Sequence, residues 1–286
     1  MAFLHRHRWL TPYALLAPGI AWLLIFFVVP LGFLGYQSLE ERDPVALTSS
    51  FSWAWHNYAD AITTYHTQFV RSLEYAGLAT LIALVVSYPL AYFIAFRGGQ
   101  WKNLLLLLIV APFFVTYLIR TLAWQNILAD NGAVVGFLRD VHVLGADGRL
   151  LQTGTAVVAG ITYNFLPFMA LPLYVSLEQI DVRLLEAAED LYASKLHAFL
   201  RVTLPLSLPG VFAGTLLTFI PAMGDFINAQ LLGSPRNHMI GNVIQARFLD
   251  LNDYPEAAAL SFVLMAAILI AVIVYARMLG TEKLTG

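Results

Sequence analysis

Residues 186–210 read EAAEDLYASKLHAFLRVTLPLSLPG, and all but the last two belong to a loop, 179–208, whose pattern is helical rather than irregular. The first apolar residues of this loop recur at the spacing of one helix face: Leu184, Leu185, Ala188, Leu191 and Tyr192. The acids lie around the other side: Glu186, Glu189 and Asp190. Asp181 precedes this pattern and is the expected N-cap. The stretch therefore predicts a short amphipathic helix with an exposed acidic face.

A second short helix is expected directly after the first, with Ser194 as its N-cap. Its apolar residues are Leu196, Phe199 and Leu200, and Pro205 and Pro209 are expected to end it. Two short amphipathic helices suit docking into a groove on a partner protein. Helices that lie flat on a membrane are the alternative, but they are usually basic, and the first of these two is acidic.

The composition of the whole chain is that of a membrane protein. Hydrophobic residues make up 59% of the chain and charged residues 12%, and the mean hydropathy is +0.71. A soluble core of 286 residues cannot hide so much apolar surface, so lipid is expected to cover the remainder. We therefore predict an integral membrane protein in contact with lipid.

Six apolar stretches approach the roughly 20 residues that a spanning helix needs. They are residues 13–39, 69–96, 103–128, 155–178, 208–232 and 257–279. No polar block between them is large enough to fold separately, so the sequence predicts one all-α transmembrane domain over 1–286. The chain shows no internal repeat.

The first and fifth of these stretches differ from simple spanning helices. Arg6 and Arg8 resemble the basic start of a signal peptide, but the apolar stretch that follows is too long and lacks a small-residue cleavage site, so a retained first span is expected. The fifth span contains residues that break or bend helices, namely Pro209, Gly210, Gly214, Pro221 and Gly224. A membrane helix tolerates such residues where neighbours supply the missing hydrogen bonds.

The distribution of charge predicts that both termini are cytoplasmic. With that orientation, nine basic residues lie inside and seven lie outside or at outer helix ends. The outer face then carries eleven acids against its seven bases, a balance of −4, which would concentrate cations near the membrane. Ordinary soluble loops would give the same balance.

Several classes of function are excluded or disfavoured. The chain has no cysteine and a net charge of −2, which excludes thiolate metal sites and disfavours nucleic-acid binding. The seven histidines are scattered and predict no metal site. No Gly-rich phosphate loop is present, so if ATP drives this protein, another chain binds the nucleotide. No catalytic arrangement stands out within the spans.

The loop resembles a known motif. Glu186-Ala187-Ala188, followed at the matching spacing by Val202-Thr203-Leu204-Pro205, is similar to the EAA loop of ABC importer permeases. Three further blocks resemble the spermidine/putrescine subgroup of that family: APFFVTYLIRTLAW near Pro112, YNFLPFMALPLYVSLEQID before the loop, and FIPAMGDFINAQLLGSPRNHMIGNVIQARFLD after it. The resemblance covers nearly the whole chain.

The resemblance implies the type I importer permease fold and a transporter built from several chains. Its partners would be a second, homologous permease that completes a heterodimeric pore, two ATP-binding subunits that hold ATP and Mg, and an external solute-binding protein. This chain would bind no cofactor itself. It would lie in the cytoplasmic (inner) membrane and move a polyamine across it by alternating access.

The same resemblance implies which loop residues meet the ATPase. They are Glu186, Ala187, Ala188, Asp190, Leu191, Tyr192, Ser194, Leu204 and Pro205. The family usually has Gly where this sequence has Tyr192. A Gly there can take backbone conformations that are costly for other residues, so Tyr192 must either turn with a negative φ or accept strain.

Asp225 is the main candidate for the substrate pathway, because ionisable residues within spans are usually functional. It follows Pro221 and Gly224 near the outer end of the fifth span, where a carboxylate could meet an ammonium group. Pairing with Arg120 or with a backbone group is the alternative. Aromatic and amide residues of spans three and four complete the predicted pathway: Tyr117, Trp124, Tyr163, Asn164 and Phe168. They are also ordinary packing residues.

Arg120 is a poor contact for a polyamine, so gating or an ion pair with an acid is expected of it. Other solutes of the same importer class stay open, namely an organic cation, a phosphonate or an iron chelate. An anion would favour basic groups or helix N-termini in the pathway. An ion-coupled secondary transporter and an intramembrane enzyme are less favoured, because few charged residues lie within the spans.

Overall fold

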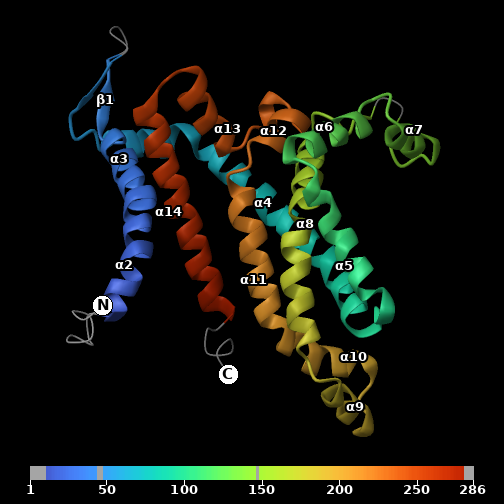
Figure 1. Ribbon diagram of the computed structural model, residues 1–286. Helices are drawn as coiled ribbons and strands as arrows, with labels where there is room; N and C mark the ends of the chain where they lie inside the picture. The colour runs from blue at the N-terminus through green and yellow to red at the C-terminus, as the bar shows by residue number, and fades with distance from the viewer. Residues whose placement is uncertain (1–10, 44–47, 146–147, 280–286) are drawn as a thin grey trace. The chain divides into compact units, whose positions relative to one another are not determined.

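The computed structural model describes residues 11–43, 48–145 and 148–279. Nearly all ordered structure in these residues is helical (Figure 1), as the sequence predicts. The chain divides into two compact units, of which unit 1 comprises 1–64 with 246–263, and unit 2 comprises 65–245 with 264–286. The basic residues Arg6, Arg8 and Lys283, which contribute to the predicted orientation, lie outside the described residues.

The described part of unit 1 begins with a long apolar helix and continues into a small hairpin. The helix consists of α2 (Thr11–Leu23), a π-helical turn (Leu24–Val28) and α3 (Val29–Gln37). The strands β1 (Glu40–Arg42) and β2 (Ser49–Phe51) pair antiparallel, with Glu40 opposite Phe51. The Asn57 side chain donates to the carbonyl oxygens of Ser38 and Glu40, at 3.0 and 2.9 Å. These two hydrogen bonds fix the chain where it leaves α3.

An ion cluster ties the rest of unit 1 to this hairpin. The Asp253 carboxylate lies 3.3 Å from an Arg42 nitrogen and 3.4 Å from an Arg247 nitrogen, and Arg247 also pairs with Glu256 at 2.9 Å. Arg42 donates in addition to the carbonyl oxygen of Leu251 at 2.7 Å. The segment after the π-helical turn Ala246–Asp250 is thereby fixed before α14 (Tyr254–Leu279) begins.

Unit 2 contains most of the remaining helices. They are the greater part of α4 (His56–Arg97), α5 (Lys102–Val110), α6 (Tyr117–Ile127), α7 (Ala133–Asp140), α8 (Gly154–Glu178), α9 (Val182–Asp190), α10 (Lys195–Ala198), α11 (Leu204–Met223), α12 (Ile227–Leu232) and α13 (Ile240–Gln245). Among the described residues, five helices are long and apolar enough to cross a membrane, and one bent pair makes a sixth candidate. Long helices are found at four of the predicted spans: 13–39, 69–96, 155–178 and 257–279. Most of their ends agree with the prediction to within a few residues, but α4 begins well before residue 69.

The third predicted span, 103–128, is not one straight helix. The helical segments Gly99–Phe114 and Tyr117–Ile127 meet at an angle of 94°. Val115 and Thr116 between them are extended, with ψ angles of 135° and 146°. Hydropathy averaged over a window cannot detect such a bend, so the prediction of a continuous span was wrong here.

The fifth predicted span, 208–232, begins and ends differently in the structure. α11 begins at Leu204, within the predicted loop, and ends at Met223, after which α12 starts at Ile227. The Asp225 carboxylate, one residue before the N-cap Phe226, accepts a hydrogen bond at 3.1 Å from the backbone N–H of Asn228 in the first turn of α12. The break therefore places Asp225 between two helices rather than inside one.

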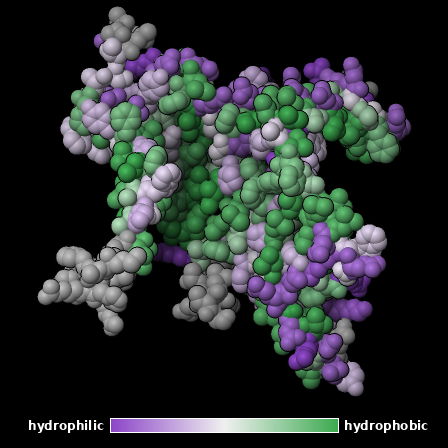
Figure 2. All heavy atoms as spheres, viewed as in Figure 1, coloured by the Kyte–Doolittle hydropathy of each residue, from purple (hydrophilic) through white to green (hydrophobic). Residues whose placement is uncertain are grey.

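Close packing of α8 against α11 holds unit 2 together. A Cβ atom added at Gly210 would lie 2.5 Å from the Ser176 Cβ atom and 2.7 Å from the Pro172 oxygen, so the two backbones approach at this point as only glycine allows. α9 and α10 lie at one end of unit 2, and α6, α12 and α13 at the other (Figure 1). Figure 2 shows apolar side chains over the middle of these helices and hydrophilic ones at the α9–α10 end.

Candidate functional site

A buried carboxylate lies at the end of unit 2 opposite α9 and α10. The Asp225 side chain is 7% exposed. Its Oδ2 atom accepts hydrogen bonds from the Tyr117 hydroxyl and from the Asn228 side-chain amide, both at 2.6 Å. The carboxylate is thus bonded to the first turn of α6 and to α12. These bonds offset part of the cost of burying its charge.

The network continues from Asp225 into α8. The Asn228 amide also donates to the Tyr117 hydroxyl oxygen at 2.6 Å. The Asn164 amide, from α8, donates to the Thr121 hydroxyl oxygen and to the Asn228 carbonyl oxygen, each at 3.3 Å. Asn164 is 1% exposed and Asn228 fully buried, so the network has little contact with solvent. Three predicted pathway residues, Tyr117, Asn164 and Asp225, are therefore brought together.

Asn228 is the central member of this network, and its role is not among the predictions from the sequence. It lies three residues after Asp225, in the first turn of α12, where its backbone N–H reaches the Asp225 carboxylate. Its role depends on the end of α11 at Met223, which the sequence did not predict. Without that break, Asn228 looks like an ordinary polar residue in a bent span.

Arg120 lies beside the network but does not pair with Asp225. Its guanidinium carbon lies 5.1 Å from the Phe113 ring centroid and 5.7 Å from that of Tyr117. Within the described part of the chain, it forms no ion pair. The sequence also allowed Asp225 to pair with a backbone group, and the carboxylate does accept from the Asn228 backbone N–H.

The predicted aromatic residues fall into two groups. Phe168 packs against Phe113, with ring centroids 5.0 Å apart, and so lies on the Arg120 side. Trp124 and Tyr163 form a pair of their own at 5.4 Å. Consecutive residues of an α-helix point about 100° apart, which is why Tyr163 faces away from the network that Asn164 joins.

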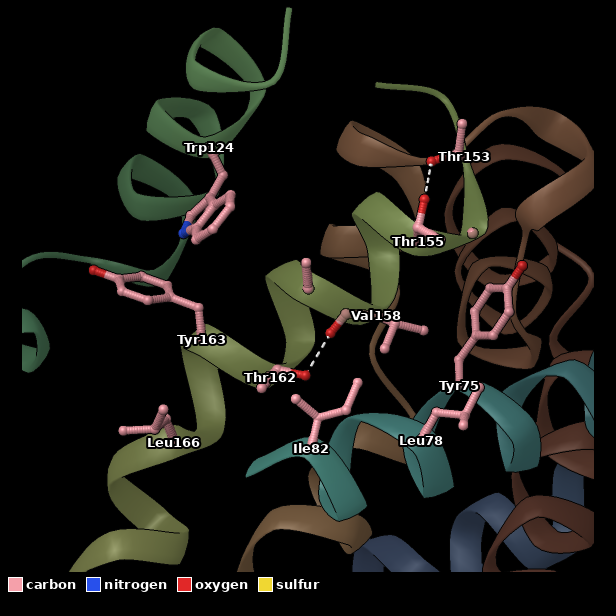
Figure 3. Close-up of a pocket in the computed structure, with 12 residues that line it drawn as sticks. Tyr75, Leu78, Ile82, Trp124, Thr153, Thr155, Val158, Thr162, Tyr163 and Leu166 are labelled. Atoms are coloured by element: carbon pink, nitrogen blue, oxygen red, sulfur yellow. Dashed lines mark hydrogen bonds between the residues drawn. The ribbon is translucent and has the colours of Figure 1, made fainter. Parts of the chain in front are cut away.

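Trp124 and Tyr163 line a cavity of about 800 Å³ between α4, α6 and α8 (Figure 3). Figure 3 places these two rings at one side of the cavity and Tyr75, with two aliphatic neighbours from α4, at the other. The described residues that line it carry hydroxyl groups but no charge: Tyr75, Leu78, Ile82, Trp124, Thr153, Gly154, Thr155, Val158, Ala159, Thr162, Tyr163 and Leu166. A cation in this cavity would meet aromatic faces but no carboxylate.

The first predicted loop helix is α9, and hydrogen bonds from nearby residues close both of its ends. The Asp181 carboxylate accepts a hydrogen bond from the Arg183 N–H at 3.0 Å, as the predicted N-cap should. At the other end, the Ala193 N–H donates to the Ala188 oxygen at 3.0 Å, a Schellman closure. Tyr192 takes the left-handed conformation that this closure needs, with φ of 60°.

Of the two backbone conformations considered for Tyr192, a turn with negative φ and a strained one, the structure shows the strained one. A left-handed backbone costs a residue with a Cβ atom about 1–2 kcal/mol. The side chain recovers nothing within the described chain, because it is 98% exposed. Leu191 is 82% exposed beside it, so two large side chains extend from the end of α9. Glu186, Ala187 and Asp190 are exposed as well.

The second loop helix, α10, begins at its predicted cap. The Ser194 hydroxyl accepts a hydrogen bond from the His197 N–H at 3.4 Å. The expected end at Pro205 and Pro209 was wrong, because a π-helical turn, Phe199–Thr203, joins α10 directly to α11. Pro205 is the second residue of α11, directly after this turn. A groove of about 510 Å³ separates α9 from α10, lined among others by Ala188, Tyr192 and Ser194.

Residues 87–280 match the family of binding-protein-dependent transport system inner membrane components. The chain belongs to this family and is a multi-pass protein of the inner membrane. It is 38% identical to the spermidine/putrescine transport system permease protein PotB of Escherichia coli over 260 residues, which cover 90% of this chain and 94% of PotB. PotB of Haemophilus influenzae is 38% identical over 90% of both chains.

Solved structures share the fold. One is a bacterial ABC transporter that imports the acidic polysaccharide alginate, which matches with a TM-score of 0.69, 18% identity, and coverage of 100% of this chain and 99% of that chain. The same kind of transporter in complex with its alginate pentasaccharide-bound periplasmic protein matches with a TM-score of 0.70, 19% identity, and coverage of 100% and 98%. The predicted fold of an ABC importer permease is therefore confirmed.

Proposed function

We propose that this chain is the transmembrane permease subunit of an ATP-driven importer of polyamines such as spermidine and putrescine. The observation that carries the proposal is the 38% identity to PotB over 90% of this chain. The acidic balance predicted for the outer face supports a cationic solute, because it would concentrate such a solute near the entrance. A phosphonate or another anion finds no comparable attraction there.

The proposed transporter has five chains around this one solute. A second permease completes the pore, two ATP-binding subunits bind ATP and Mg and hydrolyse the nucleotide, and an external binding protein delivers the solute. Both termini and the α9–α10 loop face the cytoplasm. α11 has 20 residues, about 30 Å at 1.5 Å per residue, so Asp225 lies about one bilayer thickness from the loop, toward the outer side.

The α9–α10 loop transmits the motion of the ATPase. Glu186, Ala187 and Asp190 are exposed on α9, and Leu191 and Tyr192 extend from its end. An exposed acid beside small residues permits close docking into a cleft, and the exposed Leu191 and Tyr192 supply apolar area. Ser194 fixes the start of α10, while Leu204 and Pro205 begin α11. Because the π-helical turn joins α10 to α11 directly, a push on the loop moves the helix that ends beside Asp225.

Asp225 receives an ammonium group of the solute in the proposed mechanism. A carboxylate has about four lone-pair positions, and its donors here are the Tyr117 hydroxyl, the Asn228 side chain and backbone, and the Ile227 backbone, so an ammonium group would replace one of them. The Tyr117 hydroxyl can accept as well as donate, so it can turn toward a second ammonium group. Trp124, Tyr163 and Phe168 offer aromatic faces along the path.

Uptake of labelled spermidine into liposomes tests this proposal. The complete transporter with wild-type chain is compared with Asp225→Asn, and Asp130→Asn serves as a control at a partly exposed carboxylate that pairs with Arg149. We expect uptake that requires ATP, is abolished or falls at least tenfold in Asp225→Asn, and is unchanged in the control. Uptake without ATP would overturn the importer class. ATPase activity stimulated by the binding protein without spermidine uptake would overturn the polyamine alone.

A further inference from the structure

A groove of about 470 Å³ lies along one face of the α8–α11 pair. On α8 it extends from Phe168 to Gln179, or about 17 Å at 1.5 Å per residue, which is about half the thickness of the hydrocarbon core of a bilayer. Phe168 packs against Phe113, which contacts Arg120 beside the Asp225 network, and Gln179 ends α8 just before the α9–α10 loop. The groove therefore covers the half of the helix pair between that network and the loop.

The groove carries oxygen atoms but no charge. Among the described residues that line it, all side chains are apolar except those of Ser176 and Gln179. Its floor is backbone, because Gly210 is buried there and a Cβ atom added to it would lie 2.7 Å from the Pro172 carbonyl oxygen. Glycine at this position thus leaves the backbone of α8 open to the groove.

Two prolines release backbone carbonyls on this side of the helices. Pro172 has no N–H, so the Phe168 carbonyl loses the helical hydrogen bond that it would otherwise accept. Pro221 has the same effect on the Leu217 carbonyl. Phe168 and Pro172 are four residues apart and hence on the same helix face, and both line the groove, as does Leu217. Spanning helices tolerate a released carbonyl where another donor reaches it, so the two carbonyls indicate a donor that enters the groove.

We propose that this groove is the inner half of the solute path, in which the carbonyl oxygens of Phe168 and Leu217 accept hydrogen bonds from ammonium groups that leave Asp225. The inference rests on the proposed function, since it needs a cationic solute. A protonated polyamine alternates methylene segments with ammonium groups, and apolar walls with separate oxygen acceptors match both parts. Uncharged acceptors suit an exit, because a path must bind a cation strongly enough to admit it and weakly enough to release it.

Two other occupants fit the groove less well. A lipid chain has no hydrogen-bond donor for the released carbonyls. A helix of the second permease bonds its backbone N–H groups internally, so its backbone has no donor to offer either. The solute brings donors that carry a positive charge, and their hydrogen bonds are about twice as strong as those between neutral groups.

Thiol labelling of single-cysteine variants tests the proposal in the complete transporter. Wild-type transporter in liposomes is first shown to take up spermidine with ATP, so a failure of the proposed function is detected separately. Because this chain has no cysteine, Val175→Cys and Leu217→Cys each place one thiol in the groove, at side chains that are 51% and 50% exposed. The probe is a methanethiosulfonate with a quaternary ammonium group, which reacts with thiols in water but not in lipid. It is applied to the nucleotide-free transporter in nanodiscs, and mass spectrometry of this chain measures the modification.

We expect both groove thiols to be modified, and saturating spermidine to slow their modification at least about tenfold. Ser50→Cys on the exposed strand β2 is the positive control for the reagent, and spermidine should not slow its modification. Val85→Cys, 63% exposed on α4 but outside the groove, should stay unmodified as a thiol that faces lipid. Groove thiols that stay unmodified would mean that lipid or a helix fills the groove, and modification that spermidine does not slow would mean that the solute does not enter it. Either result would overturn the inference.

Pro172→Ala tests the released carbonyl itself. Alanine restores the N–H that bonds the Phe168 oxygen within α8, so we expect ATP-driven uptake of spermidine to fall about tenfold, the effect of one hydrogen bond to a charged group. Pro89→Ala in α4 makes the same change at an exposed residue outside the groove and should alter uptake less than about twofold.

ATPase activity stimulated by the binding protein separates the loss of an acceptor from a change in helix shape. Pro172→Ala should keep this stimulation while uptake falls, and the protection of Leu217→Cys by spermidine should weaken in the same background. Uptake that falls no more than in Pro89→Ala would contradict the inference. A loss of stimulation in proportion to the loss of uptake would contradict it as well, because it would assign the effect to the shape of α8.

Discussion

The Tyr117 hydroxyl donates to the Asp225 carboxylate over 2.6 Å, and this hydrogen bond joins α6 to the break between α11 and α12, 108 residues further along the chain. Both residues lie at helix breaks. α6 begins at Tyr117, directly after the break at Thr116, and α11 ends at Met223. Broken helices at membrane depth are stable only where protein groups satisfy the released backbone and side chains. The pair is therefore both a structural link and the polar centre of the proposed pathway.

Replacing Tyr117 by Phe should lower the free energy of unfolding by about 1.5–3 kcal/mol, the usual value for a hydrogen bond to a charged group. The variant removes the donor to Asp225 and the acceptor of the Asn228 amide, while the ring that packs on Arg120 is kept. Unfolding of the purified chain in mixed micelles by titration with dodecyl sulfate measures the change.

Tyr163→Phe is the matched control for this experiment. The Tyr163 hydroxyl belongs to the apolar cavity and not to the network, so its loss should change stability by less than about 0.5 kcal/mol. Equal losses in the two variants would mean that the bond from Tyr117 to Asp225 does not hold the broken helices together.

Gly210→Ala should destabilise the chain by about 1–3 kcal/mol through overpacking. The added Cβ atom would meet backbone and Cβ atoms of α8 at 2.5–3.1 Å, which a rotamer change cannot relieve. Gly136→Ala in α7 is the control, because nothing lies within 4 Å of its added Cβ atom and alanine favours a helix over glycine by up to about 1 kcal/mol. The same titration should show opposite signs for the two variants.

Local signals explain what the sequence predicted correctly. The caps at Asp181 and Ser194 depend on residues three or fewer positions away, so they could be recognised in the sequence and are found in the structure. The long spans follow from hydropathy alone. The family and its fold were recognisable because the loop Glu186–Gly210 has a characteristic spacing, and the match over 87–280 confirms it.

The rest depends on tertiary structure. The 94° break at Val115 and Thr116 leaves the apolar composition unchanged, so hydropathy did not reveal it. Asn228 acquires its role only because α11 ends early. The continuation of α10 through Pro205 was missed because a π-helical turn was not expected.

Asp253→Asn should loosen the ion cluster of unit 1 while the start of α14 stays capped. The variant removes the charge that Arg42 and Arg247 share, but its amide oxygen still accepts from the Glu256 N–H. Because the side chains are partly exposed, we expect a loss of about 1 kcal/mol in local stability. Hydrogen exchange of the β1–β2 hairpin measures it.

Salt provides the control for this prediction. At about 1 M NaCl the Debye length falls to about 3 Å, so the difference between wild type and Asp253→Asn should shrink to about half or less. A difference that does not respond to salt would show that the variant acts through packing or hydrogen bonding instead of charge.

Tyr192→Gly should stabilise the end of α9 by about 0.5–1 kcal/mol. Tyr192 has φ of 60°, which glycine adopts without the penalty of a Cβ atom, although glycine also gains entropy in the unfolded chain. Tyr192→Ala separates the backbone from the ring, since it keeps the Cβ atom and removes a ring that is 98% exposed. Hydrogen exchange over 182–203 in the isolated chain should be slower in the Gly variant and unchanged in the Ala variant. Faster exchange in Tyr192→Gly would show that the left-handed turn costs this chain nothing. In the complete transporter, both variants should reduce ATPase activity coupled to uptake if the ring contacts the ATPase, and a loss confined to Tyr192→Gly would assign the effect to the backbone instead.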